Sequence, residues 1–220
     1  MKKLYSYLFI LFSVTPLVSC KTSIKEPIEI DNLSYVNDFE LIQNYTNKDT
    51  MIKIMSPRAI IDQSNNNIKI YENSILFLNK KNNNNVEIKS GRAELNNSIN
   101  ILKVYNDVFI SLLNSDDSFI RTKRLNWDLN SSTINLDNPF DFNLKNTKIK
   151  SNSGSYNIVT NHLKINSNIF NQSFYDKDGV KKYQIEIISE NGNWFKNKKI
   201  LEFSSNNKQV ETRIDFLSIK

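Results

Sequence analysis

The sequence predicts an all-β protein, an open, curved β-jelly-roll or β-sandwich of stacked two-strand repeats that follows an N-terminal signal peptide. Apolar residues alternate with polar ones through most of the chain, as at Val108, Ile110 and Leu112, and helical periodicity is nearly absent after residue 20. Alternation rich in β-branched and aromatic residues indicates half-buried strands. Related segments also recur at a nearly regular interval, which indicates a repeat architecture.

Each repeat consists of two strands joined by a polar, often Asn-rich, turn. Equivalent positions of four repeats are Ala59, Ala93, Leu125 and Gly154, which are separated by 34, 32 and 29 residues. A degraded fifth repeat begins near Ser189, and one strand at residues 38–42 precedes the first repeat. A single unit could not bury its apolar face, whereas stacked units share one interior, so we expect roughly eleven to thirteen strands.

The first twenty residues have the organisation of a bacterial lipoprotein signal. Two lysines precede an apolar run at residues 4–14, which is shorter than the ~20 residues that a spanning helix needs. The run Leu17-Val18-Ser19-Cys20 then matches the lipobox, in which the cysteine thiol carries diacylglycerol. We therefore expect a signal peptide at 1–19, lipid attachment at Cys20 and a lipidated tether at 20–32. An uncleaved anchor helix with an incidental cysteine is the alternative.

Charge and composition exclude several classes of function. The formal net charge is +6, and removal of the two signal lysines leaves +4, which permits an anionic partner without requiring one. We expect no nucleic-acid partner for an exported chain. The single cysteine allows no internal disulfide, and the single histidine, His162, allows no ordinary zinc site. Because no catalytic constellation is present either, we expect no metal, no cofactor and no enzymatic activity.

The inward positions of the strands define a candidate apolar interior. Alternation assigns large apolar side chains to these positions, and the sequence leaves open whether they fill the interior or line a hollow. The candidates are Ile54, Ile61, Ile70, Phe77, Leu95, Ile110, Leu112, Trp127, Leu136, Phe142 and Tyr156.

Several segments resemble a known family of transport proteins. The segments at 39–42, 51–59 and 70–77, followed by Arg121-Thr-Lys-Arg-Leu-Asn-Trp-Asp128 and Ile134-Asn-Leu-Asp-Asn-Pro139, are similar to LptC-type lipopolysaccharide-export proteins. The related LptA and OstA proteins share this repeat. The resemblance implies that residues 33–170 are an LptC/OstA-like β-jelly-roll. The chain continues past the usual end of the family, and we expect 171–220 to be a C-terminal β extension of the same stack. LptC-type proteins commonly use a transmembrane helix where this chain has a lipobox.

The resemblance implies a component of lipopolysaccharide export. Such a jelly-roll would hold acyl chains in an apolar trough lined by the candidate interior residues, and its neighbours would be an export ABC transporter and an LptA-like jelly-roll. Edge strands would pair with these partners, the strand near Phe39 on the membrane side and a late strand near Ile169 or Phe216 on the other. We expect the protein in the cell envelope, facing the periplasm and anchored by its lipid, at the inner membrane. A structural β-sandwich lipoprotein of the outer envelope, without lipid transfer, is the alternative.

Three arginines occupy the same position of successive repeats. They are Arg58, Arg92 and Arg124, and on adjacent strands they would form a basic ladder with neighbours ~4.8 Å apart. Such a ladder could contact anionic headgroups. Solvated arginines paired with acids on the same sheet face are the alternative, because their parity is opposite to that of the interior candidates.

Overall fold

The computed structural model describes residues 32–44, 50–79, 85–113 and 118–216. The expected signal peptide and Cys20 lie outside these residues, as does nearly all of the tether. The described residues form one short 3-10 helix, Lys196–Lys198, and thirteen strands. The strands are β1 (Leu33–Asn44), β2 (Thr50–Asp62), β3 (Asn67–Asn79), β4 (Asn85–Asn96), β5 (Ile101–Leu113), β6 (Phe119–Asp128), β7 (Thr133–Leu136), β8 (Phe140–Leu144), β9 (Thr147–Asn157), β10 (His162–Tyr175), β11 (Lys181–Phe195), β12 (Ile200–Ser204) and β13 (Glu211–Phe216).

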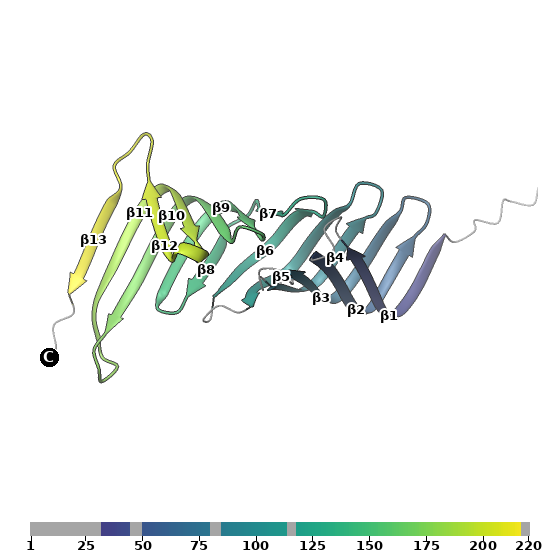
Figure 1. Ribbon diagram of the computed structural model, residues 1–220, viewed down its shortest axis with the longest axis horizontal. Helices are drawn as coiled ribbons and strands as arrows, with labels where there is room; N and C mark the ends of the chain where they lie inside the picture. The colour runs from purple at the N-terminus through teal and green to yellow at the C-terminus, as the bar shows by residue number, and fades with distance from the viewer. Residues whose placement is uncertain (1–31, 45–49, 80–84, 114–117, 217–220) are drawn as a thin grey trace, which may run out of the picture. The chain divides into compact units, whose positions relative to one another are not determined.

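All thirteen strands belong to one antiparallel sheet, in which β1 to β6 and β9 to β12 pair in the order of the sequence (Figure 1). The short strands β7 and β8 together take one position between β6 and β9. At the end of the sheet, β12 and β13 both pair with β11. The predicted all-β class with stacked two-strand units is therefore confirmed.

Each long strand bends once near its middle, and the bends align across the sheet as a crease. Asp38 in β1, Glu72 in β3 and Ser167 in β10 adopt positive φ angles of 51°, 50° and 51° at this point. The inward parity also shifts there: in β2 the buried positions up to Ser56 are even-numbered, whereas the next buried residue is Ala59. We call the strand halves that carry Ala59, Ala93 and Trp127 the first layer.

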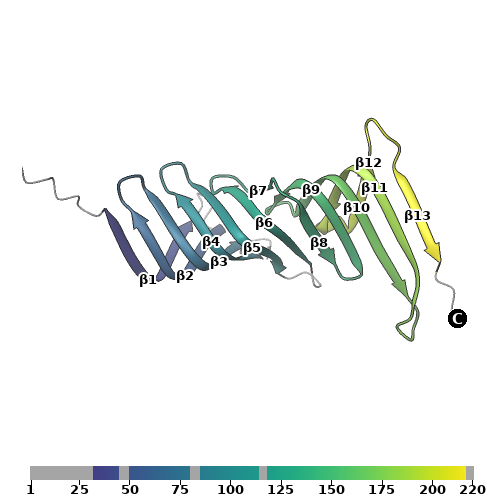
Figure 2. The ribbon, with the colours of Figure 1, turned by 180° about the vertical axis from the view of Figure 1, so that it is seen from behind.

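The second layer consists of the strand halves on the other side of the crease, including those that carry Ile54, Phe77 and Phe142. The inward side chains of the two layers form one hydrophobic core that runs from Phe39 in β1 to Trp194 in β11. The same succession of bent strands is seen from the front and from behind (Figures 1 and 2). The fold is thus a sheet doubled over at its crease, with the core between its halves.

The segment from 171 to 216 continues the sheet. Strand β10 extends to Tyr175, and around Ile169 it pairs with both β9 and β11, so it has no free edge there. The free edges lie on β1 at one end and on β12 and β13 at the other. Of the two late strands proposed from the sequence, the one near Ile169 is therefore excluded as an edge, and the one near Phe216 remains. Across the described part of the chain, no helix has the length and apolar character needed to cross a bilayer.

Candidate functional site

The predicted interior residues lie between the two layers. All of them except Ile61 are at most 2% exposed, including Trp127, Phe142 and Tyr156 at 0%. Ile61 lies near the outer end of β2, where it is half-buried and outside the hydrophobic core. The sequence therefore identifies the inward face of the strands correctly. Ile61 has the inward parity, but it lies too near the end of its strand to be fully buried.

Aromatic side chains from opposite layers meet across this interior. The ring centroids of Phe77 and Trp127 are 6.2 Å apart, and those of Phe142 and Trp194 are 4.8 Å apart. The Trp127 indole N–H donates to the Ser131 carbonyl at 3.0 Å, which satisfies its polar atom. These contacts join the side chains of the two layers within the core.

Tyr156 brings a second polar group into the interior. Its hydroxyl lies 2.8 Å from Oδ1 of Asn161, which is itself 1% exposed. Burial raises the pKa of Tyr156 well above its ordinary value, because the phenolate would be poorly solvated there. The phenol therefore stays neutral and acts as a hydrogen-bond donor, and the interior keeps its uncharged character.

Both ends of the doubled sheet bring the apolar interior to the surface. At the β1 end, Val36 and Leu41 pack against the core and are only half-buried. At the other end, the register aligns Tyr183 with Phe216 and Ile185 with Ile214. Ile214 is 49% exposed and Phe216 80% exposed. The interior is thus covered in the middle and accessible beside both free edges.

A row of hydroxyl side chains fixes the crease. In the strands β2, β4, β6, β9 and β11, a buried Ser or Thr occupies the bend, and its hydroxyl oxygen lies 2.7–3.3 Å from the carbonyl oxygen two residues later. The residues are Ser56, Ser90, Thr122, Ser151 and Ser189. Each hydroxyl donates a hydrogen bond to a backbone carbonyl that the bend removes from the regular pattern of the sheet. The row therefore stabilises the angle between the layers.

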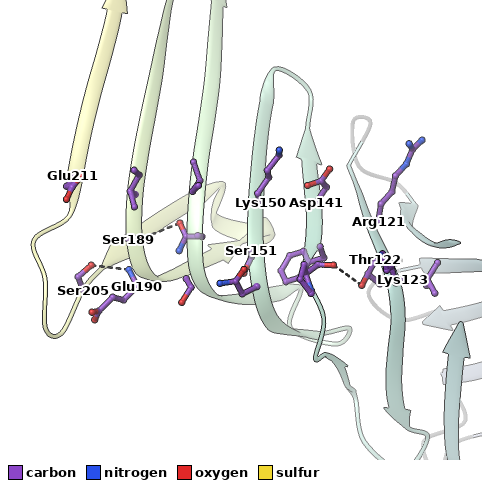
Figure 3. A pocket seen from close by; sticks show the side chains of 18 of the residues that line it. Arg121, Thr122, Lys123, Asp141, Lys150, Ser151, Ser189, Glu190, Ser205 and Glu211 are labelled. Carbon is purple, nitrogen blue, oxygen red and sulfur yellow. Dashed lines mark hydrogen bonds between the residues drawn. The ribbon is translucent and has the colours of Figure 1, made fainter. Parts of the chain in front are cut away.

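An open groove of about 1050 Å³ lies on the outer side of this crease, between β5 and the connection from β12 to β13. Figure 3 shows Arg121, Asp141, Lys150 and Glu211 at one level of the groove, with Glu190 and Ser205 across the crease from them. The crease residues Thr122, Ser151 and Ser189 form its floor. The charged side chains of the groove lie on the outer face of the sheet, and two residues of the hydrophobic core, Val108 and Phe140, also line it, so the groove borders the interior at the crease.

Comparison with known protein families identifies the family of this chain. The sequence profile of a family described as lipopolysaccharide-assembly, LptC-related, matches residues 8–170, which is most of the chain. The chain belongs to the LptC family. It therefore has a role in lipopolysaccharide transport, and it is associated with the cell envelope. No curated protein matches the chain.

The repeat-position arginines of this LptC-family chain lie on the outer face of the first layer. They are two strands apart and not on adjacent strands, because Tyr71 separates Arg58 from Arg92 and Tyr105 separates Arg92 from Arg124. The predicted ladder with ~4.8 Å neighbours is therefore wrong, since each repeat contributes two strands to the sheet.

Each of these arginines has a local partner. Arg58 lies over the Tyr71 ring at 4.7 Å, Arg92 pairs with Glu94, and Arg124 donates to Oδ1 of Asn138 at 2.9 Å. The alternating Arg and Tyr side chains form a strip on the outer face, away from the interior. Contact with anionic headgroups remains a prediction for this strip.

Two features of the site were not found from the sequence. The crease hydroxyls had a signal, since each lies three residues before Ala59, Ala93, Leu125, Gly154 or Gly192 in the aligned repeats. The outer groove had none, because its residues come from seven strands and a distant connection. Among the described residues, no group of three His, Cys, Asp or Glu side chains is placed to hold a metal ion.

Proposed function

We propose that the chain is a lipid-binding bridge component of lipopolysaccharide export, which holds acyl chains between its two layers and passes them to a neighbouring jelly-roll. The observation that carries this proposal is the continuous apolar interior, which reaches the surface at both free edges of the sheet. Acyl chains in water cost ~25 cal/mol for each Å² of apolar surface. An apolar path from end to end would remove most of that cost at each step.

The free edges support pairing with partners at both ends. Edge strands present unpaired N–H and C=O groups, which soluble proteins usually shield and which a partner strand can satisfy. Here β1 is free at one end, and β12 and β13 are free at the other. The β1 end would face the transporter at the membrane, and the β12–β13 end would receive the next jelly-roll.

A second candidate is a structural β-sandwich lipoprotein without lipid transfer. The observation in its favour is the closed middle of the interior, where Phe77 and Trp127 meet and are at most 2% exposed. A permanently filled core would give the same side-chain contacts. The two candidates therefore differ in whether lipopolysaccharide can displace these contacts.

The two tryptophans provide a test on the unmodified mature protein. Trp127 and Trp194 are the only tryptophans, and both lie in the interior at 0% and 6% exposure. Lipopolysaccharide with brominated acyl chains should quench their fluorescence, whereas a brominated, water-soluble analogue should not. Binding of the lipid without quenching would refute the acyl-chain site and favour the structural alternative.

Adjacent residues of β8 provide a matched cross-linking test. Phe142 points inward at 0% exposure, and Asp141 points to the outer face. A benzophenone photo-cross-linker at position 142 should form adducts with lipopolysaccharide in cells, and the same group at position 141 should not. Adducts only within the protein at position 142, in a variant that unfolds like the parent, would contradict the proposal.

The C-terminal edge is tested through the apolar end of β13. Ile214 and Arg213 are neighbours on opposite faces of this strand, and both are exposed. Ile214→Gln should weaken capture of a purified LptA-type jelly-roll, whereas Arg213→Gln should leave it unchanged. Equal capture by both variants would exclude this end of the sheet as the docking site.

Membrane attachment through Cys20 is part of the proposal. Its support is the lipobox directly after the apolar run at 4–14, where other members of the family commonly use a helix. Cys20→Ser should abolish incorporation of labelled fatty acid and release the protein from inner-membrane fractions. A Cys20→Ser protein that still sediments with that membrane would show that another segment is the anchor.

A further inference from the structure

We propose that the outer groove at the crease binds an extended, acidic peptide segment of a partner protein, with carboxylates near β6 and β9 and an apolar side chain on β10 and β11. The inference goes beyond lipid transport, because only Val108 and Phe140 of the groove lining belong to the apolar core. It also gives a role to the segment after residue 170, which the family profile does not cover.

The C-terminal segment builds one end of the groove. Glu190 holds the connection between β12 and β13 in place, since its carboxylate accepts the backbone N–H groups of Asn206 and Asn207 at 2.8 and 3.2 Å. The Ser205 side chain accepts the Glu190 backbone N–H at 3.0 Å. The two hydrogen bonds from the Asn206 and Asn207 amides lower the pKa of the Glu190 carboxyl, because they stabilise its charged form. The wall that carries Lys208 and Glu211 is therefore an ordered part of the groove.

Cations without ionic partners occupy the middle of the groove. Lys123 and Lys150 are exposed and form no ion pair with any residue that the structure describes. The Arg121 guanidinium lies 5.4 Å from the Phe109 ring centroid and 5.3 Å from that of Phe119. These aromatic contacts hold the guanidinium in place, and its N–H groups are not engaged by a carboxylate of the described residues. These three side chains are available to carboxylates of a partner.

The acidic residues of the groove are either engaged or at its ends. Asp141 lies between Arg121 and Lys150 in the register, but its carboxylate pairs with Lys148 at 2.8 Å. Glu190 binds the backbone amides described above. The remaining acids, Asp107 and Glu211, lie at the β5 and β13 ends. The unpaired charge in the centre of the groove is therefore positive.

An apolar pair lies next to these cations. Ile169 and Ile188 are direct cross-strand partners, and they are 40% and 41% exposed on the outer face of the sheet. Two neighbouring β-branched residues with this exposure offer an apolar contact to a ligand side chain. The groove thus combines a basic centre with an apolar end.

The spacing of the charges favours a polypeptide over a compact phosphate. Arg121 and Lys150 lie on strands with β8 between them, so their backbones are separated by two strand spacings, ~9.6 Å. A single phosphate would need donors that converge on one point. An extended peptide can instead place successive carboxylates along the groove and an apolar side chain beyond them.

The test uses the full mature chain and a fluorescent peptide of about eight residues in which serine alternates first with glutamate and then with valine, so that the glutamates and valines share one face of the extended chain. At ~3.4 Å per residue the peptide is long enough to span the groove. We expect saturable binding that Arg121→Gln/Lys150→Gln weakens about fivefold or more. Lys69→Gln/Lys103→Gln removes the same charge from exposed positions of the first layer and should change binding less than twofold. Ile169→Thr/Ile188→Thr should weaken binding of this peptide but not of one in which serine replaces the valines.

The other outcomes overturn the proposal. Absence of saturable binding would refute it, and equal losses in the two charge variants would show a non-specific electrostatic effect. Preferential binding of phosphatidylglycerol vesicles or inorganic phosphate at the groove, with no competition by the peptide, would replace the peptide with a phosphate ligand. None of these results depends on lipopolysaccharide, so they are distinguishable from failure of the proposed transport function.

Discussion

Gly154 is the position where one added methyl group should do most damage to the fold. It lies on the first-layer half of β9, opposite Ile165 of β10. A Cβ atom at this position would lie 2.4 Å from the Lys164 carbonyl oxygen and 3.1 Å from the Phe140 ring. The closer neighbour is backbone of a paired strand, so relief requires β9 and β10 to separate beside the crease. We expect Gly154→Ala to lower the free energy of unfolding by about 1–3 kcal/mol, the usual cost of overpacking.

Thermal unfolding followed by circular dichroism measures this effect. In a domain of this size each kcal/mol shifts the Tm by about 2–4 °C, so the expected decrease is about 2–12 °C. Ser155→Ala is the matched control, because Ser155 is the next residue on the same strand and points to the other face. A Gly154→Ala protein with the Tm of the control would show that β9 and β10 are not packed as closely as the structure indicates.

Three further substitutions test the crease and the interior. Ser151→Ala removes a buried hydroxyl that bridges two backbone carbonyls, and urea titration should show a loss of about 1–3 kcal/mol. Glu72→Gly relieves a positive φ of 50° and should raise the free energy of unfolding by up to ~1 kcal/mol in the same assay. The raised pKa of Tyr156 means that above pH ~10 the unfolded state loses a proton that the folded state keeps, so stability falls as pH rises. Tyr156→Phe should lack that part of the decrease, and parallel pH profiles of the two proteins would contradict the assignment.

The fold was predictable because each repeat encodes it locally. Alternation in segments such as Val108, Ile110 and Leu112 fixes which side chains point inward, and the recurrence of Ala59 and Ala93 fixes the stacking. The same local rules placed Trp127 and Phe142 in the interior. Where a single strand changes its inward parity, as β2 does between Ser56 and Ala59, the bend was not evident from alternation alone.

Features that depend on several strands were not predictable in the same way. The arginines were expected on adjacent strands because they share a repeat position, yet every repeat inserts a second strand, and Tyr71 and Tyr105 occupy the intervening places. The outer groove combines Arg121 with Glu190 and Ser205, which are far apart in sequence. Such sites arise from the register of the whole sheet, which no short segment specifies.

Under the proposed function, the distribution of exposure along the interior determines where an acyl chain would first enter. In the middle, Phe77 and Trp127 meet across the layers, and the buried crease hydroxyls fix the angle between the layers. Opening this region would break packed aromatic contacts and backbone hydrogen bonds together. At the ends, side chains such as Leu41 and Ile214 already reach solvent, so a guest displaces water instead of protein. Because a partner jelly-roll would cover those same ends, docking and lipid entry would involve one apolar surface, and transfer would begin only where two jelly-rolls share it.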